Sequence, residues 1–368
     1  MTVNQSGLKR AKILLLSLES KRAPNFENLN NAANKLASFG YYCDRAERVA
    51  YDSQSEITAA VKEGVERFEN VIVLCPQSTG KAVKDFVSSL CGAQFDLSGV
   101  LSSGNTHVFV LFFDGENRLQ FGDIKQILDK KYGVMYDKCV VRTVGAPARL
   151  MNKAVEAAGE RFPNGGVSFN IQDDYGDTRI EIVYSSLTPK MTLDDAVREI
   201  LKILNDYVYA LEDITLPEQL YRLLKLRRMK ISVAESFTGG GVGKKLVEVA
   251  GISEVYAEGL NTYSNQSKMD RLGVSQLTLI QNGAVSAETA FQMAEGLIKA
   301  GNCDVAISTT GIAGPKSDNT SKPVGLAYIG VAVGEDIAVY KYNFSGDRER
   351  ITKAAINEAL FRAYKRLK

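Results

Sequence analysis

The sequence has almost no histidine, and this shortage limits the chemistry open to the chain. It holds one histidine, His107, and five scattered cysteines with no CxxC or Cys/His ligand spacing, so we expect neither a zinc site nor a disulfide framework. His107 precedes the apolar run Val108–Phe113 and is predicted to be a structural strand residue. Unless His107 serves as the base, a hydrolytic mechanism has to work without the histidine of the common triads.

Blocks of like charge and long apolar runs are missing as well. The formal net charge is +2 and is not clustered, which gives no support for nucleic-acid binding. No run approaches the roughly 18 apolar residues of a membrane span, and Ile13–Leu18 is too short for a secretory signal. We therefore expect a cytoplasmic protein with reduced thiols, no nucleic-acid partner and no membrane association.

The length of 368 residues predicts two or three domains. Apolar runs alternate with helical patterns in the first third of the chain, which is typical of a three-layer α/β domain. A shorter mixture follows, with a hairpin of Val167–Gln172 and Arg179–Tyr184 and a helix over Thr192–Tyr209. We predict an α/β domain over residues 1–135, a small α+β module over 136–209 and a second α/β domain over 210–368.

The third domain contains the stretch Ala234–Gly241, which reads A-E-S-F-T-G-G-G. It lies between an apolar run that ends at Val233 and a helical pattern over Val242–Ala250. A turn of this kind presents hydroxyls and unpaired N–H groups at a helix start, where an anion or a developing oxyanion is stabilised. Taken alone, the stretch is more typical of an ordinary helix N-cap than of an anion site. The segments that follow it decide between the two interpretations.

Four further motifs follow in order: Y-S-N-x-x-K at Tyr263–Lys268, GAVS at Gly283–Ser286, TGIAGP at Thr310–Pro315 with KPVG at Lys322–Gly325, and GDR at Gly346–Arg348. With A-E-S-x-T-G-G they extend over about 140 residues and closely resemble the C-terminal domain of the competence-damage-inducible CinA family. That domain also exists alone as nicotinamide mononucleotide deamidase. The resemblance implies a three-layer α/β fold and an amidohydrolase that converts nicotinamide mononucleotide to nicotinate mononucleotide and ammonia in pyridine-nucleotide salvage. It implies a small-molecule nucleotide substrate, no metal or other cofactor, and a homodimer.

The residues of these motifs suit amide hydrolysis, which needs a nucleophile, a base and donors for the oxyanion. Ser236 is the predicted nucleophile, and Lys268 is the predicted base because burial can depress the pKa of a lysine. Tyr263 is predicted to relay a proton or to hold the nucleotide, and Thr310 to supply oxyanion or substrate contacts at a strand end. The other predicted substrate contacts are Glu235, Thr238, Gly239, Gly240, Ser264, Asn265, Gly311, Gly314 and Arg348. Four of these are also candidates to hold the phosphate: Gly239, Gly240, Gly314 and Arg348.

Some positions depart from the family pattern. Phe237 stands where the family usually has cysteine, Asn282 stands where it usually has histidine, and Lys316–Asn319 replaces a glycine pair. Phe237 is bulky beside the predicted nucleophile, so we expect it to crowd or reshape the pocket. A catalytically silent scaffold is therefore an alternative to the amidase.

The first two predicted domains fit the layout of full-length CinA proteins, a molybdopterin-binding-like domain followed by a KH-like module. The glycine- and aspartate-rich loop of the former is replaced by Leu74–Lys81, without the carboxylates that hold a metal against a pyrophosphate. Glu19–Pro24 also lacks the glycines of the family's first loop. We predict a degenerate domain with a structural or dimerisation role, and ADP-ribose pyrophosphatase or nucleotide binding through it is the other alternative. Arg142–Pro147 has no G-x-x-G clamp, so the module is not expected to bind RNA.

Overall fold

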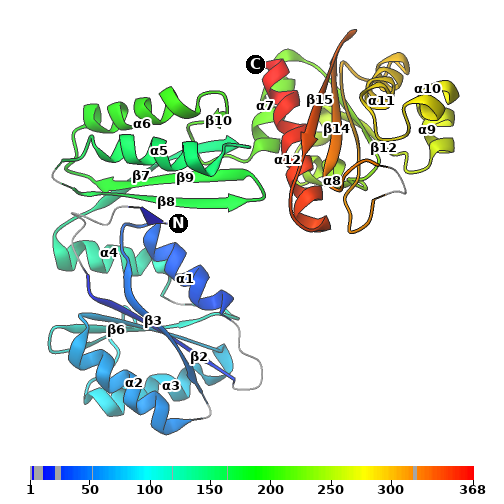
Figure 1. The fold of residues 1–368 in the computed structure, drawn as a ribbon. Helices are drawn as coiled ribbons and strands as arrows, with labels where there is room; N and C mark the ends of the chain where they lie inside the picture. Colours follow the sequence, from blue (N-terminus) through cyan, green and yellow to red (C-terminus); the bar gives the residue numbers. More distant parts are fainter. Residues whose placement is uncertain are drawn as a thin grey trace. The chain divides into compact units, whose positions relative to one another are not determined.

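The computed structural model describes residues 2–3, 11–20, 26–51, 53–117, 119–163, 165–317 and 321–368. The chain packs into two compact units, one of residues 1–139, 155–170 and 181–199 and one of residues 140–154, 171–180 and 200–368. In the part of the chain that the structure describes, three five-stranded sheets with their helices confirm the predicted mixed α/β class (Figure 1). The predicted domain limits stay a prediction. Within the described ranges, no helix is both long and apolar enough to cross a membrane.

The N-terminal sheet has the strand order β3-β2-β4-β6-β5 and is parallel except for β5. Helices α1 and α4 cover one face and helices α2 and α3 the other, each against its own apolar cluster (Figure 1). His107 lies in strand β6, as predicted. The elements are β2 (Ile13–Glu19), α1 (Glu27–Ala37), β3 (Cys43–Ala50), α2 (Gln54–Arg67), β4 (Asn70–Cys75), η1 (Gln77–Thr79), α3 (Gly80–Cys91), β5 (Val100–Ser103), β6 (Thr106–Phe112) and α4 (Phe121–Tyr132).

Two of the segments that differ from the CinA family lie partly outside the described residues. These are Lys21–Pro24 of the first loop and, in the third domain, Asp318–Asn319 of the segment after TGIAGP. The second loop is described: Gln77–Thr79 forms a 3-10 turn that leads into α3.

The second sheet has the order β1-β8-β9-β7-β10 and includes the predicted hairpin as β8 and β9. Its elements are β1 (Thr2–Val3), β7 (Tyr136–Val144), α5 (Ala148–Gly159), β8 (Val167–Asp174), β9 (Asp177–Ser185), α6 (Lys190–Leu204) and β10 (Val208–Ala210). The prediction of a helix as far as Tyr209 was wrong, because α6 ends at Leu204 and Val208–Ala210 pairs with β7 instead. The buried Tyr209 hydroxyl accepts a hydrogen bond from Arg142 Nε (2.6 Å), a polar contact that favours the strand position.

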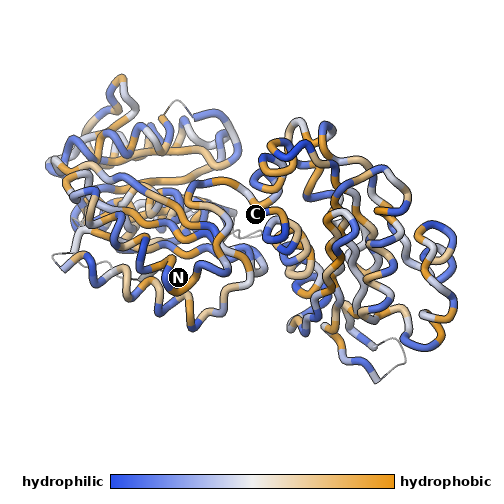
Figure 2. Tube along the Cα trace, turned by 90° about the horizontal axis from the view of Figure 1, so that it is seen from above, coloured by the Kyte–Doolittle hydropathy of each residue, from blue (hydrophilic) through white to orange (hydrophobic). Residues whose placement is uncertain are grey.

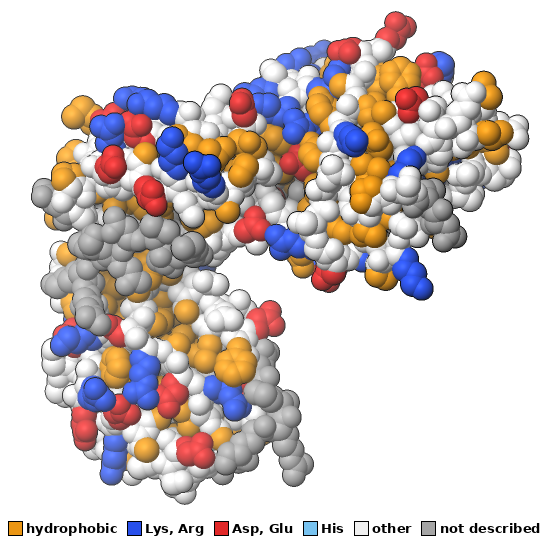
Figure 3. Space-filling model, viewed as in Figure 1, with side chains coloured by type: hydrophobic (Ala, Val, Ile, Leu, Met, Phe, Trp, Pro, Cys, Tyr) orange, Lys and Arg blue, Asp and Glu red, His pale blue; other side chains and the backbone are white. Residues whose placement is uncertain are grey.

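The C-terminal sheet has the order β12-β11-β13-β14-β15. Helices α7, α8 and α12 pack on one face, and α9, α10 and α11 on the other. Hydrophobic residues concentrate along the strands, as Figure 2 shows, and some remain visible where the edge strand β15 reaches the surface (Figure 3). The elements are α7 (Leu216–Arg227), β11 (Ile231–Glu235), α8 (Gly241–Val247), η2 (Ile252–Glu254), β12 (Tyr256–Asn261), α9 (Asn265–Leu272), α10 (Gln276–Gln281), α11 (Ala287–Lys299), β13 (Val305–Gly311), β14 (Leu326–Val333), β15 (Asp336–Asn343) and α12 (Arg348–Leu367).

The strand directions gather the motifs of the third domain at one edge. Strand β11 is parallel to β12 and β13, and β14 is antiparallel to both β13 and β15. The carboxyl ends of β11, β12, β13 and β15 therefore lie at the same edge, where α8 and α12 begin. The carboxyl edge of parallel strands is where α/β proteins usually bind ligands.

Candidate active site

Ser236 is the first residue after the buried strand β11. Its main-chain N–H donates to the Thr309 carbonyl of the neighbouring strand β13 (3.1 Å), which extends the parallel pairing by one residue. Its carbonyl accepts the Gly239 N–H (3.1 Å), which closes a tight turn directly after the serine. The serine side chain is thus placed by the sheet on one side and by the turn on the other.

Lys268 reaches Ser236 from helix α9 and is 1% exposed. Its Nζ lies 3.0 Å from Ser236 Oγ, 2.7 Å from the Thr262 carbonyl oxygen and 3.1 Å from the Tyr263 carbonyl oxygen. Burial disfavours the charged ammonium and lowers the pKa of Lys268 from 10.5 to about 8. The structure therefore brings together the predicted nucleophile and the predicted base.

The arrangement also orients the lysine. A neutral amine has two N–H donors and one lone pair, and the two carbonyls of Thr262 and Tyr263 can take both donors. The lone pair then faces the third neighbour, Ser236 Oγ, which can donate its proton to it. This geometry provides a general base without histidine.

Glu235, which was predicted to contact the substrate, binds the start of helix α8. The residue is 2% exposed. Its carboxylate accepts hydrogen bonds from the main-chain N–H groups of Gly240 (3.0 Å), Val242 (3.0 Å) and Gly243 (2.8 Å). A buried carboxylate needs such donors, and it also suits the positive end of helix α8. The N–H group of Gly239 is used by Ser236. We predicted from the sequence that an anionic group of the substrate binds at this helix start, but the carboxylate of Glu235 lies there.

The predicted threonines make hydrogen bonds within the protein. Thr238 Oγ1 lies 2.6 Å from Thr309 Oγ1, and both residues are buried. Thr310 Oγ1 donates to the Ala284 carbonyl (2.6 Å), which ties the end of β13 to the GAVS segment. Both hydroxyls hold the loops around Ser236 in place.

The Tyr263–Asn265 segment contributes its backbone more than its side chains. Tyr263 presents its carbonyl to Lys268, while the residue is 65% exposed. Ser264 is the N-cap of helix α9, where its side chain accepts the Ser267 N–H (3.1 Å), and Asn265 is exposed at the first helical position. The cap fixes the start of the helix that carries Lys268.

The TGIAGP loop is held from α12 and from the KPVG segment. Arg348 Nη1 donates to the Gly314 carbonyl (2.7 Å). Lys322, whose role sequence reasoning did not identify, donates from Nζ to the carbonyls of Asn282 (2.7 Å) and Val285 (2.6 Å). Asn282, which stands where the family usually has histidine, therefore contacts Lys322 through its main-chain carbonyl.

Phe237 does not crowd the serine, contrary to the sequence-based expectation. It is 6% exposed and belongs to an apolar cluster with Ala313, Ala327, Ile351 and Ala355. This cluster includes residues of α12, which covers one face of the sheet, whereas Lys268 comes from α9 on the opposite face. Phe237 therefore packs into the core on the α12 side, while Ser236 contacts Lys268 from the α9 side.

The turn after the serine leaves two backbone donors available. No hydrogen bond from the main-chain N–H of Phe237 or Thr238 occurs within the described residues. The side-chain oxygen Oγ1 of Thr262, the residue whose carbonyl accepts from Lys268, is buried and has no hydrogen-bond partner among the described residues. Nothing in the sequence alone distinguishes these donors from their neighbours, because the turn geometry sets which N–H groups remain unpaired.

Residues 213–367 match the CinA C-terminal domain family. A putative competence-damage inducible protein of Caldicellulosiruptor saccharolyticus is 47% identical over 171 residues, which are 46% of this chain and 42% of the relative. A CinA-like protein of Kosmotoga olearia is 45% identical over 163 residues, 44% of this chain and 40% of the relative. The matched region thus spans about two fifths of these curated relatives.

Solved structures also resemble part of the chain. The competence/damage inducible protein CihA of Agrobacterium tumefaciens is 35% identical, with 41% of this chain and 97% of that chain covered and a TM-score of 0.38. A CinA superfamily protein of Escherichia coli is 30% identical, with 41% and 87% covered and a TM-score of 0.40. Through residues 213–367, the chain belongs to the CinA family.

Proposed function

We propose that the C-terminal domain hydrolyses the carboxamide of nicotinamide mononucleotide, giving nicotinate mononucleotide and ammonia. The observation that carries this proposal is the buried pair of Ser236 and Lys268, 3.0 Å apart, with the pKa of the lysine lowered to about 8. A serine–lysine pair suits acyl transfer from an amide. The family's motifs around the pair supply the choice of substrate.

In the first half of the reaction, neutral Lys268 takes the proton of Ser236 Oγ as that oxygen attacks the carboxamide carbon. The carbonyl electrons move to oxygen, and the resulting oxyanion accepts the N–H groups of Phe237 and Thr238 in this scheme. The lysine ammonium then gives its proton to the departing nitrogen. Ammonia leaves, and an ester of Ser236 with the nicotinate group remains.

In the second half, water replaces the ammonia. Lys268 removes a proton from the water as it attacks the ester carbon, and the same backbone donors stabilise the second oxyanion. The C–O bond to Ser236 breaks, and the serine oxygen regains a proton from Lys268. Nicotinate mononucleotide leaves, and the enzyme returns to its starting protonation state.

The test is ammonia release from nicotinamide mononucleotide by the purified full chain, with and without EDTA, beside Ser236→Ala. We expect release that EDTA leaves unchanged and that Ser236→Ala reduces at least about a thousandfold, the size of effect typical for a missing nucleophile. A wild-type protein that releases no ammonia would contradict the proposal and favour the catalytically silent scaffold.

A further inference from the structure

Thr262 connects the two residues of the proposed catalytic pair. Its main-chain N–H donates to the carbonyl of Glu235, the residue before Ser236 (2.8 Å), and its own carbonyl accepts from Lys268 Nζ (2.7 Å). The residue follows strand β12 directly and is 1% exposed. Thr262 therefore lies inside the site, next to both the serine and the lysine.

The side chain of Thr262 lies on the same face of the sheet as that of Ser236. Ala234 of β11 and Leu260 of β12 lie opposite each other, and both pack against the apolar cluster of α9 and α11. Side chains along a strand alternate between the two faces, so the residues two positions further along return to this face. These residues are Ser236, which contacts Lys268 of α9, and Thr262.

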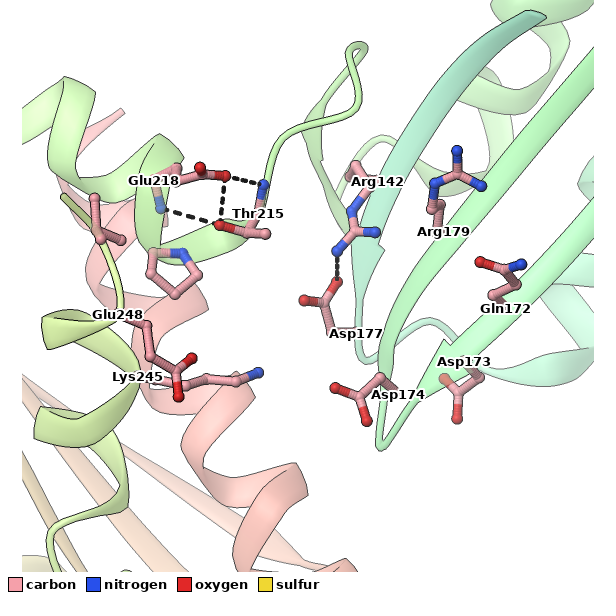
Figure 4. A pocket seen from close by; sticks show the side chains of 12 residues that line it. Arg142, Gln172, Asp173, Asp174, Asp177, Arg179, Thr215, Glu218, Lys245 and Glu248 are labelled. Atoms are coloured by element: carbon pink, nitrogen blue, oxygen red, sulfur yellow. Dashed lines mark hydrogen bonds and ion pairs between the residues drawn. The ribbon is translucent and has the colours of Figure 1, made fainter. Parts of the chain in front are cut away.

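The Thr262 hydroxyl has no partner within the protein. Its Oγ1 is buried and makes no hydrogen bond to any described residue. A buried hydroxyl that has lost its bonds to water destabilises the folded chain unless another group replaces them. Figure 4 shows the usual situation elsewhere, where the Thr215 hydroxyl donates to the Glu218 carboxylate (2.7 Å) and Arg142 is bonded to Asp177 (3.1 Å). Thr262 departs from this pattern beside the reactive residues.

A water molecule can satisfy this hydroxyl and Lys268 together. Buried waters make about three hydrogen bonds, usually to polar groups that lack other partners. Water accepts the O–H of Thr262 and donates one of its protons to the lone pair of the neutral amine. Because Lys268 Nζ is bonded to the carbonyl of the same threonine, one water can bridge the two groups. In the ester intermediate Ser236 has no proton to donate, so the lone pair of Lys268 is free for the water.

We propose that Thr262 Oγ1 holds the water that attacks the ester on Ser236 in the second half of the reaction. This inference rests on the proposed function and adds a water-positioning residue to the serine and the lysine. Lys268 removes one proton of that water, the water oxygen forms the new C–O bond, and the bond to Ser236 breaks as its oxygen regains the proton from Lys268. Thr262 keeps its own proton and fixes the direction of the attack. The amide nitrogen leaves from the position that the water enters, so both half-reactions depend on the hydroxyl.

Thr143 provides a matched control. It lies in β7, is 0% exposed, and its Oγ1 is also buried without a hydrogen-bond partner among the described residues. Strand β7 belongs to the second sheet, between β9 and β10, and not to the sheet that carries Ser236. Removing the Thr143 hydroxyl therefore tests the loss of a buried, unpartnered hydroxyl outside the proposed site.

The test measures chemical denaturation and ammonia release from nicotinamide mononucleotide for the full chain and for Thr262→Val, Thr262→Ser and Thr143→Val. Because neither hydroxyl bonds to another protein group, both valine variants should be at least as stable as the wild type. Thr262→Val should nevertheless release ammonia at least about tenfold more slowly, as the loss of one positioning hydrogen bond predicts. Thr262→Ser, which keeps the hydroxyl, should recover most of the rate, and Thr143→Val should keep the wild-type rate.

A crystal structure of the wild-type chain supplies a readout that does not depend on activity. We expect an ordered water within hydrogen-bond distance of both Thr262 Oγ1 and Lys268 Nζ, and its loss in Thr262→Val. An unchanged rate in Thr262→Val, a lower stability of that variant, or the absence of the water from the wild type would overturn the inference. Failure of the proposed function has a different signature, because the ordered water in a wild type that releases no ammonia would support the water site and contradict the substrate.

Discussion

The low pKa of Lys268 predicts a specific pH dependence of the proposed amidase activity. Only the neutral amine can accept the proton of Ser236, and the pKa of about 8 places half of the lysines in that form near pH 8. The neutral fraction rises from about one tenth at pH 7 to about nine tenths at pH 9. The rate under conditions of limiting substrate should therefore rise about tenfold between these pH values and then level off.

The assay is the initial rate of ammonia release, measured at substrate concentrations well below KM from pH 7 to pH 10. This range begins above the second ionisation of a phosphate group, near pH 6, so the charge of the substrate stays constant. Lys268→Met should lose the activity at every pH. Lys299→Met, an exposed lysine on α11, should keep the profile of the wild type.

Two results would refute this reasoning. A rate that does not change from pH 7 to pH 10 would show that no group with a pKa near 8 has to lose its proton. A rate that still rises steeply with pH at pH 10, without levelling off, would show that Lys268 titrates like a lysine in water, with a pKa near 10.5, so that burial does not prepare it as a base.

Three further predictions concern stability, each measured by chemical denaturation. Between the lowered pKa of Lys268 and 10.5, the unfolded state binds more protons than the folded state, so the free energy of unfolding rises with pH. The free energy of unfolding of the wild type, minus that of Lys268→Met, should therefore increase by about 2 kcal/mol between pH 8 and pH 10. A constant difference would contradict the lowered pKa. Glu235→Gln should lower the free energy of unfolding by about 1–3 kcal/mol, because the N–H groups at the start of α8 lose their charge-assisted hydrogen bonds. The control Glu335→Gln, in an exposed turn, should change the free energy of unfolding by less than about 0.5 kcal/mol. Equal effects of the two substitutions would exclude the capping role of Glu235. Phe237→Ala should cost about 3–5 kcal/mol because it leaves a cavity in the core, and a cost below about 1 kcal/mol would place this ring outside it.

The proposed nucleophile and base could be predicted from the sequence because their chemistry and position are both local. Ser236 follows an apolar run and precedes glycines and a helical pattern, which indicates a strand-to-helix turn. Lys268 was the base expected of a chain with one histidine, within a motif of the CinA family. Only the structure shows that the lysine is buried and that two carbonyls orient it.

The roles of Glu235 and Phe237 could not be predicted because they depend on side-chain direction. A carboxylate beside a serine fits a substrate contact as well as a helix cap, and only the path of the turn directs Glu235 to the start of α8. Likewise, the sequence places Phe237 next to Ser236 but does not show that the two side chains leave on opposite faces. Adjacency in the sequence was mistaken for adjacency in the site.

The end of helix α6 illustrates a tertiary effect on secondary structure. The helical pattern that begins near Thr192 continues in the sequence to Tyr209, but Val208–Ala210 pairs with β7. Backbone pairing to a distant strand and the hydrogen bond between Tyr209 and Arg142 determine this end. Neither partner is near in sequence, so a local pattern does not reveal it.

The central claim is that Ser236 and Lys268 act as one catalytic unit on nicotinamide mononucleotide. The most direct test is a double-mutant comparison of ammonia release by the wild type, Ser236→Ala, Lys268→Met and the protein with both changes. If the lysine works only through the serine, each single change should abolish nearly all of the activity and the double change should lower it no further. If the two losses multiply, or if Ser236→Ala keeps most of the activity, the serine–lysine mechanism is wrong.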